Sequence, residues 1–280
     1  MMQRREFLAA STAAAIGLAA NHVATAQEHA AQDRDGHGDE SPARQLIELR
    51  VYHFASAPKR QAYESFLAGA AIPAYNRAGA RPVGAWKLLA KDNPELKLTA
   101  DANDLYVVLP HKTPQSFLEL TSRLAADQEL QQAGRAVIAA PKSDPAFTRY
   151  ETSLLHAFPG FPGVNVPTKA PGRLAQLRIY ESHGYERARK KIEMFDKAGE
   201  IAVFKKVGLN PVFFGRNLAG SKMPSLTYMV AFDDEKAMKA GWDAFRADPD
   251  WKKLSGDEAY KDTVSNITNL VLRPVEGSQI

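Results

Sequence analysis

The sequence contains no cysteine among its 280 residues. Disulfide bonds, iron–sulfur clusters, thiolate zinc sites and a cysteine nucleophile are therefore excluded. HExxH, GxSxG and glycine-rich phosphate-loop motifs are also missing where each would have its required structural context, which disfavours hydrolase and nucleotide-dependent functions. No hydrophobic run reaches the roughly 20 residues that cross a bilayer, so stable membrane insertion is not expected.

The chain also has little excess of either charge, because its formal net charge is only +4. Basic residues are interleaved with acidic ones, as in the run 186–196, which is typical of a solvated helix face. Nucleic acid is therefore not expected as a partner.

The first residues have the pattern of an export signal. Gln3-Arg4-Arg5-Glu6-Phe7-Leu8 resembles the bacterial twin-arginine motif, and Ala24-Thr25-Ala26 resembles a cleavage site. We expect cleavage between Ala26 and Gln27 and a periplasmic or secreted protein. Residues 27–44 are polar and acidic and cannot bury enough apolar area to offset the entropy of ordering them, so we expect a disordered leader there.

The rest of the chain contains one pattern twice. Ile47-Glu48-Leu49-Arg50-Val51-Tyr52 recurs as Ala175-Gln176-Leu177-Arg178-Ile179-Tyr180. Each copy alternates apolar and polar residues, as a strand with one apolar face does. Each leads into a long amphipathic segment that ends in a glycine and then a proline, Gly79 to Pro82 and Gly208 to Pro211. Repeats of this size indicate a duplicated domain.

Both copies continue in the order β-α-β-β-α-β, with a helix N-cap predicted at Thr113 in the first and at Asp233 or Asp234 in the second. The predicted strands are 46–52, 83–89, 105–109 and 148–157, then 174–181, 212–218, 226–232 and 266–273. We therefore predict an α+β fold of tandem ferredoxin-like domains, in which two four-stranded antiparallel sheets pack as a pseudo-dimeric barrel with the helices outside.

The predicted domain boundaries follow from these patterns and from a Pro- and Gly-rich connection between the copies. They are a signal peptide (1–26), a leader (27–44), a first α/β-barrel domain (45–158), a linker (159–172) and a second α/β-barrel domain (173–280).

Four segments carry a family resemblance. Glu48–Tyr52, Ile72–Gly79, Gly199–Phe204 and Leu270–Pro274 are similar to the NIPSNAP family, within the dimeric α/β-barrel superfamily. The resemblance covers essentially the whole mature chain and implies an exported bacterial two-domain form of a family that has no settled enzymatic activity. Many single-domain relatives carry a histidine where this chain has isoleucine (Ile72 and Ile201), so no role for that histidine can be transferred.

Polar and aromatic residues of the predicted strands and their flanks are the candidate site residues. Arg50 and Tyr52 recur as Arg178 and Tyr180. This recurrence has two explanations: a structural role in the sheet that both copies share, or a role in lining a cavity in or beside the barrel. His53 and His111 belong to adjacent antiparallel strands, whose geometry places them at opposite ends. The candidate catalytic residues are Tyr52, His53, Tyr75 and His156, and the candidate ligand-binding residues are Arg50, Arg81, Trp86, Tyr180, His183 and Tyr185.

Tyr75, Arg81 and Trp86 flank one junction between a helix and a strand. They are consistent either with an aromatic pocket wall that carries a cation or with core packing.

Three functions remain open. The superfamily resemblance implies a small-molecule enzyme of cofactor-free oxygenase or isomerase type, with Tyr or His as acid or base in a buried cleft. A haem enzyme, with a histidine as axial ligand, is the lesser alternative. A noncatalytic ligand-binding or protein-interaction module would need only the barrel and a groove. We expect a small-molecule ligand, no cofactor and no metal site, and leave homo-oligomerisation open.

Overall fold

The computed structural model describes residues 43–280. The predicted signal peptide, its predicted cleavage site between Ala26 and Gln27, and nearly all of the predicted leader lie outside this part. Among residues 43–280 no helix is both long and apolar enough to span a membrane.

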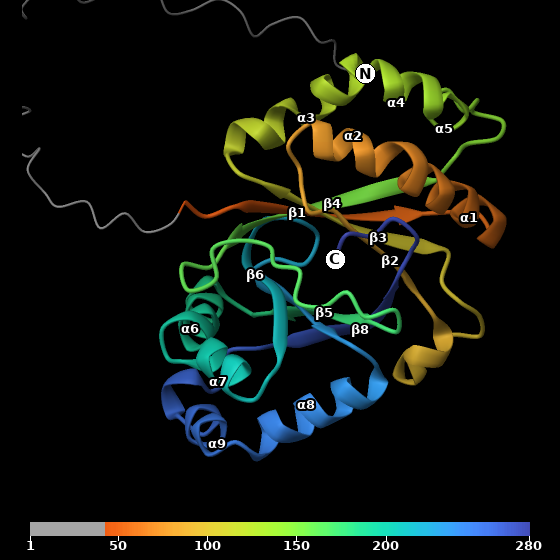
Figure 1. Ribbon diagram of the computed structural model, residues 1–280. Coiled ribbons are helices and arrows are strands. Elements are labelled where there is room, and N and C mark those ends of the chain that lie inside the picture. Colours follow the sequence, from red (N-terminus) through yellow and green to blue (C-terminus); the bar gives the residue numbers. More distant parts are fainter. Residues whose placement is uncertain (1–42) are drawn as a thin grey trace, which may run out of the picture. The chain divides into compact units, whose positions relative to one another are not determined.

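Eight antiparallel strands form a closed barrel in the order β1-β3-β2-β8-β5-β7-β6-β4 (Figure 1). Each copy of the repeat supplies four neighbouring strands, which confirms the predicted fold class. The first copy gives β1 (Leu46–His53), β2 (Gly84–Leu88), β3 (Asp104–His111) and β4 (Arg149–Ala157). The second gives β5 (Leu174–Glu181), β6 (Asn210–Ala219), β7 (Ser225–Phe232) and β8 (Asn266–Pro274).

The two sheets are joined at both edges by backbone pairing. β2 pairs with β8, and β4 pairs with β6. The sequence predicted sheets that face each other but not these joins. Their consequence is a barrel that leaves no sheet edge unpaired.

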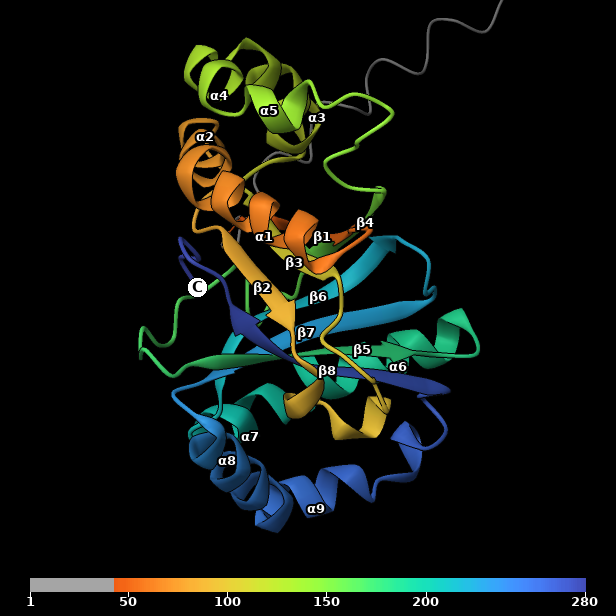
Figure 2. The same cartoon turned by 90° about the vertical axis from the view of Figure 1, so that its right-hand side faces the viewer.

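The helices of the first copy cover one side of the barrel and those of the second copy cover the opposite side (Figure 2). The first group contains α1 (Ala57–Phe66), the π-helical η1 (Leu67–Ala71), α2 (Ile72–Arg77), α3 (Pro114–Ala126), α4 (Gln128–Ala133) and α5 (Arg135–Ile138). The second contains α6 (Tyr185–Asp196), α7 (Glu200–Lys206), α8 (Glu235–Ala247) and α9 (Pro249–Ser255). Short 3₁₀ turns complete the set: η2 (Ala90–Asp92), η3 (Pro94–Leu96) and η4 (Glu258–Tyr260).

The predicted helix caps are confirmed. The Thr113 side chain accepts a hydrogen bond from the backbone N–H of Ser116, and the Asp234 side chain accepts one from Ala237. Such bonds satisfy backbone donors that the first turn of a helix leaves free.

The long helix of each copy is interrupted at the same place. In the first copy the chain passes through η1, whose wider turn accommodates Pro73, a residue with no N–H to donate. In the second copy the helix stops and restarts at Gly199, which has φ of 103°. An isoleucine follows the interruption in each copy, Ile72 in the first and Ile201 in the second. The residue immediately before it is Ala71 in the first copy and Glu200 in the second.

Both faces of the sheet are buried, but in different surroundings. Ile47 and Leu49 belong to an apolar core inside the barrel that draws residues from all eight strands. Glu48, Arg50 and Tyr52 alternate with them and therefore face the helices. The polar face that the sequence pattern indicated is thus covered by α1, η1 and α2.

Trp86 lies inside the barrel. It is 1% exposed and packs in the same core as Ile47 and Leu49. The neighbouring Gly84 makes room for it, since a Cβ there would lie 1.9 Å from the indole ring. Tyr75 packs on the helix side of the sheet. Of the two alternatives for Tyr75, Arg81 and Trp86, core packing therefore holds for both rings, and a shared aromatic pocket wall does not, because the sheet separates the two rings.

Candidate functional site

A pocket of about 370 Å³ lies between the sheet and the helices of the second copy. Strand residues supply its polar groups, and α8 and α9 supply aromatic walls. Its lining residues are Gln176, Arg178, Tyr180, Glu200, Tyr228, Trp242, Phe245, Arg246, Trp251 and Asn269. We call it the second-copy pocket.

Arg178 is the cation of this pocket. One guanidinium nitrogen donates to the Tyr180 hydroxyl at 2.9 Å, and that hydroxyl lies 3.3 Å from the hydroxyl of Tyr228. The guanidinium carbon lies 5.3 Å from the ring centroids of both Tyr180 and Trp242. The buried Nε has no hydrogen-bond partner in the described residues. Arg178 is therefore held between two aromatic rings with a donor to spare.

No carboxylate on the strand neutralises Arg178. The residue two positions earlier on the same strand face is Gln176, a neutral amide. Its side chain donates to Asn269 at 2.7 Å and accepts from the Trp242 indole at 2.5 Å. Both ends of the amide are thus occupied, and Arg178 is left to interact with whatever enters the pocket.

Glu200 is the only carboxyl in the lining of this pocket, and it is 2% exposed. The Lys191 ammonium donates to one of its oxygens at 3.0 Å and itself lies 4.6 Å from the Phe195 ring. Burial raises the pKa of Glu200 above its ordinary value, although the charges of Lys191 and Arg178 act to lower it. A carboxyl with a raised pKa in a pocket is typical of an acid–base site.

Glu200 is not among the candidates that the sequence indicates, although it stands in the Gly199–Phe204 segment that carries the family resemblance. The available signal was its lack of a counterpart: a charged residue occurs at a helix position where the first copy has Ala71.

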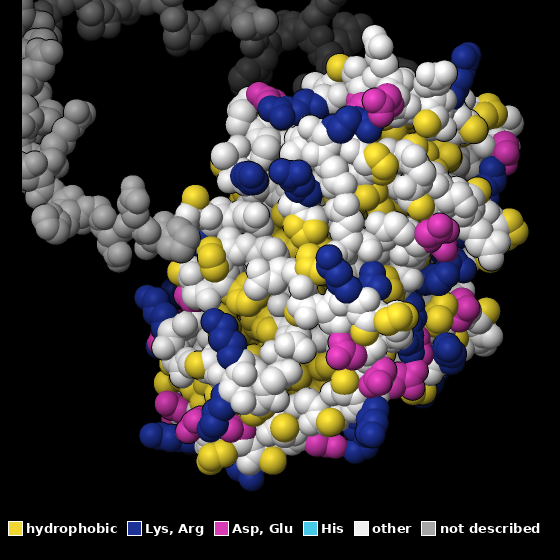
Figure 3. All heavy atoms as spheres, in the orientation of Figure 1, with side chains coloured by type: hydrophobic (Ala, Val, Ile, Leu, Met, Phe, Trp, Pro, Cys, Tyr) yellow, Lys and Arg dark blue, Asp and Glu magenta, His cyan; other side chains and the backbone are white. Residues whose placement is uncertain are grey.

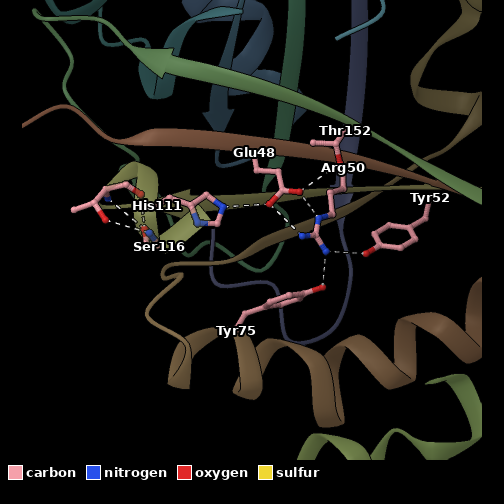
Figure 4. A network of polar contacts seen from close by, with 8 residues as sticks. Glu48, Arg50, Tyr52, Tyr75, His111, Ser116 and Thr152 are labelled. Carbon is pink, nitrogen blue, oxygen red and sulfur yellow. Dashed lines mark hydrogen bonds and ion pairs between the residues drawn. The ribbon is translucent and has the colours of Figure 1, made fainter. Parts of the chain in front are cut away.

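The corresponding cluster in the first copy is closed (Figure 4). The Arg50 guanidinium donates to both oxygens of Glu48, at 2.6 and 3.1 Å. Glu48 also contacts the His111 ring nitrogen at 3.2 Å and accepts from the Thr152 hydroxyl at 3.3 Å. Burial acts to raise the pKa of Glu48, but hydrogen bonds from His111 and Arg50 outweigh it and lower the pKa.

The structure brings three of the predicted candidates together in this cluster. Arg50 donates to the hydroxyls of Tyr52 and Tyr75, at 3.4 and 3.3 Å. Burial raises the pKa of Tyr75 well above its usual value, although Arg50 acts to lower it. Tyr75 therefore stays protonated at neutral pH.

The histidine candidates lie apart from one another. His53 and His111 are at opposite ends of the β1–β3 pair, as predicted, and His53 forms a 2.8 Å contact with Asp104. His156 lies on β4, paired in register with Arg216 of β6. Burial, then the charges of Arg44 and Arg216, lowers the pKa of His156.

The remaining candidates divide between pocket and surface. Tyr180 lines the second-copy pocket. His183 and Tyr185 are exposed beyond β5, and Tyr185 has 84% of its surface accessible. Arg81 is exposed on the rim of a separate groove that Lys169 and Arg173 also line. Within residues 43–280 no three His, Asp or Glu side chains are grouped so as to hold a metal ion.

Comparison with solved structures identifies the fold. A protein from Fusobacterium nucleatum, provisionally named a monooxygenase, has a TM-score of 0.55 at 10% identity, over 83% of this chain and 93% of its own. A protein from Lactobacillus acidophilus with the same provisional name has a TM-score of 0.52 at 13% identity, over 84% and 97%. At these identities the likeness shows the dimeric α/β-barrel fold alone.

At the level of sequence, one family model matches part of the chain. No curated protein sequence matches the chain significantly. The NIPSNAP family model matches residues 175–279, a range that includes every lining residue of the second-copy pocket. The part of the chain that builds this pocket is therefore the part that is similar to the NIPSNAP family.

Proposed function

We propose that the chain is a small-molecule enzyme of cofactor-free oxygenase or isomerase type, with its active site in the second-copy pocket. One observation carries the proposal: a buried carboxyl with a raised pKa, Glu200, and a guanidinium that forms no ion pair with a carboxylate of the described residues, Arg178, line the same cavity. The provisional names of the two structural neighbours agree with the oxygenase type.

The first step is the same for both reaction types. The ionised Glu200 takes a proton from a carbon next to a carbonyl group, and the C–H electron pair moves into the carbonyl to give an enolate. The Arg178 guanidinium then stabilises the negative charge on the enolate oxygen. An isomerase returns the proton to another carbon of a conjugated enolate. In an oxygenase the enolate carbon forms a C–O bond with dioxygen, which supplies the oxidant and is reduced to a carbon-bound peroxide.

The walls of the pocket favour an aromatic substrate. Trp242 and Trp251 line it, and the Arg178 guanidinium carbon lies 5.3 Å from the centroid of the Trp242 ring. Flat rings pack well against such walls, and the pocket volume of about 370 Å³ suits a compact molecule. We further propose, from the twin-arginine-like motif, that the enzyme acts in the periplasm.

Hydrogen–deuterium exchange tests the proposal without knowledge of the final product. Phenylpyruvate combines an aromatic ring with acidic C–H groups next to a keto carbonyl. Incubated with the protein in D₂O, it should lose the NMR signal of those protons faster than in buffer. Glu200→Gln should slow this exchange by about 10²–10⁴-fold, the range of general-base catalysis.

A matched control separates chemistry from general damage. Glu258, in an exposed ion pair with Lys261, undergoes the same change from carboxyl to amide in Glu258→Gln. That variant should exchange at the wild-type rate. Wild-type exchange no faster than that of Glu200→Gln would contradict the proposal.

Binding without catalysis is the second candidate function, and one contact favours it. Lys191 already holds the Glu200 carboxyl at 3.0 Å, and a carboxylate engaged in an ion pair is a weaker base. The same experiment distinguishes the two functions, because a binding protein would take up phenylpyruvate without accelerating exchange.

A further inference from the structure

The first copy has a cavity of about 450 Å³ among its own helices and the segment 140–147 that leads into β4. Aromatic and aliphatic side chains make up most of its lining. The lining residues are Tyr63, Phe66, Ala71, Tyr75, Thr121, Leu124, Ala125, Leu130, Gln131, Val137, Ile138, Ala140, Pro145, Ala146 and Phe147. We call it the first-copy cavity.

Internal symmetry relates the helical wall of this cavity to the helical wall of the second-copy pocket. The segment 124–127 matches 245–248 along the repeat. Asp127 and Asp248 at its end each cap the next helix and accept from the residue three positions on, Leu130 and Trp251. Because these caps fix the register of the helices around them, lining residues that lie on helices in both copies can be paired.

The pairing shows that the charged and indole groups of one cavity are absent from the other. Ala71 stands where the second copy has Glu200, and Ala125 stands where it has Arg246. In the same register Thr121 and Leu130 correspond to Trp242 and Trp251, which leaves more room. The helical wall of the first-copy cavity is therefore uncharged at positions where that of the second-copy pocket is charged.

No Asp, Glu, Lys, Arg or His lines the first-copy cavity. Burial raises the pKa of both Tyr63 and Tyr75 well above the usual value, so both phenols are neutral at pH 7. Arg50, behind Tyr75, is already paired with Glu48 at 2.6 Å. An anion would lose its hydration here without gaining a counter-charge, which costs several kcal/mol in order of magnitude.

We propose that the first-copy cavity is a second ligand site, for a neutral aromatic molecule. The rings of Tyr63, Phe66, Tyr75 and Phe147 would pack against it, with the hydroxyl of Thr121 and the amide of Gln131 as polar contacts. Its volume lies within the range of small-molecule sites, about 300–1,000 Å³. This site is independent of the activity proposed for the second-copy pocket.

The fluorescence of the neutral probe N-phenyl-1-naphthylamine tests this site, because the emission of the probe rises in apolar surroundings. Ala125→Trp fills the cavity from an exposed position on α3 and should weaken binding by about tenfold or more. Ala126→Trp makes the same change at the next residue, which is also exposed but does not line the cavity, and should bind as the wild type does.

Two further variants make the result decisive. Thr121→Trp introduces the residue that the second copy has at the corresponding position, and it should weaken binding as Ala125→Trp does. With two cavity-filling variants, misfolding of one of them would not leave the proposal untested. Arg178→Gln should leave probe binding unchanged. The proposal would be overturned if the wild type did not bind the probe, or if Ala125→Trp and Thr121→Trp bound it as tightly as the wild type does. Loss of probe binding in Arg178→Gln would also overturn it.

Discussion

The two copies hold an arginine at the same place and treat it differently. Arg50 is bound to both oxygens of Glu48, at 2.6 and 3.1 Å, and donates to two tyrosines. Arg178 donates to Tyr180 and has an unpaired Nε. The residue two positions earlier, glutamate in one copy and glutamine in the other, decides between a closed structural cluster and an open site.

The carboxyl groups of the two copies also occupy different elements. In the first copy Glu48 lies on the strand, beside its arginine. In the second copy Glu200 lies at the start of α7, next to the helix interruption, and is paired with Lys191. A duplicated fold can therefore carry one closed polar cluster and one open polar pocket without a change of architecture.

The largest expected effect is on stability. Glu48→Gln gives the first copy the amide of the second and leaves Arg50 buried without a counter-ion. Breaking a buried ion pair costs about 3–5 kcal/mol. Urea denaturation should show a loss of that size, whereas Glu258→Gln should unfold as the wild type does. A loss below about 1 kcal/mol, the range of exposed pairs, would mean that Glu48 does not hold Arg50 in this way.

The converse change should close the second-copy pocket. Gln176→Glu places a carboxylate beside Arg178, as Glu48 stands beside Arg50. Phenylacetate binding should weaken by about 10–100-fold, since a hydrogen bond to a charged group contributes roughly 1.5–3 kcal/mol. Tryptophan fluorescence can follow the binding, because two of the three tryptophans line the pocket. Unchanged affinity would contradict the role given to the residue at position 176.

The pH profile of exchange should report on Glu200. Only its ionised form can accept a proton, so exchange should rise with pH through the Glu200 pKa, which burial lifts above the ordinary value near ~4.3. The Lys191 charge lowers this pKa, so Lys191→Met should move the rise to higher pH. Lys190→Met, at the adjacent and more exposed ion pair with Glu193, should leave it in place. A rise that stays put or moves to lower pH in Lys191→Met would exclude Glu200 as the base.

A smaller difference is expected in acid stability. The folded-state pKa of Glu48 is lowered, so its stabilising contribution is present above its unfolded value near ~4.3 and is lost as pH falls through the folded value. The free energy of unfolding should therefore fall less steeply on acidification in Glu48→Gln than in the wild type. Urea titrations at several pH values measure this difference, and equal slopes would contradict the lowered pKa.

Much of the fold could be predicted from local patterns. The alternation from Ile47 to Tyr52 identified a strand, and Thr113 and Asp234 marked helix starts, because these signals depend on neighbouring residues. The pairing of β2 with β8 and of β4 with β6 could not be predicted, since it joins strand edges far apart in sequence. Alternation also does not reveal that the polar face is buried beneath helices, which depends on what packs above it.

The candidate site was harder to predict for a similar reason. The candidates Tyr52, Tyr75 and Arg50 do meet in the structure, yet whether an arginine is free depends on a partner that only the folded chain shows. Glu200 was overlooked because a glutamate at a helix start usually lies in solvent. Its burial follows from the interruption at Gly199, which turns this end of α7 toward the sheet.

The most direct test of these assignments is a crystal structure of the protein soaked with phenylacetate. The carboxylate of the ligand should lie within hydrogen-bond distance of the Arg178 guanidinium, with its ring against Trp242, while Arg50 stays bound to Glu48. An empty second-copy pocket, or phenylacetate at Arg50 in place of Glu48, would contradict the distinction between the open and the closed copy.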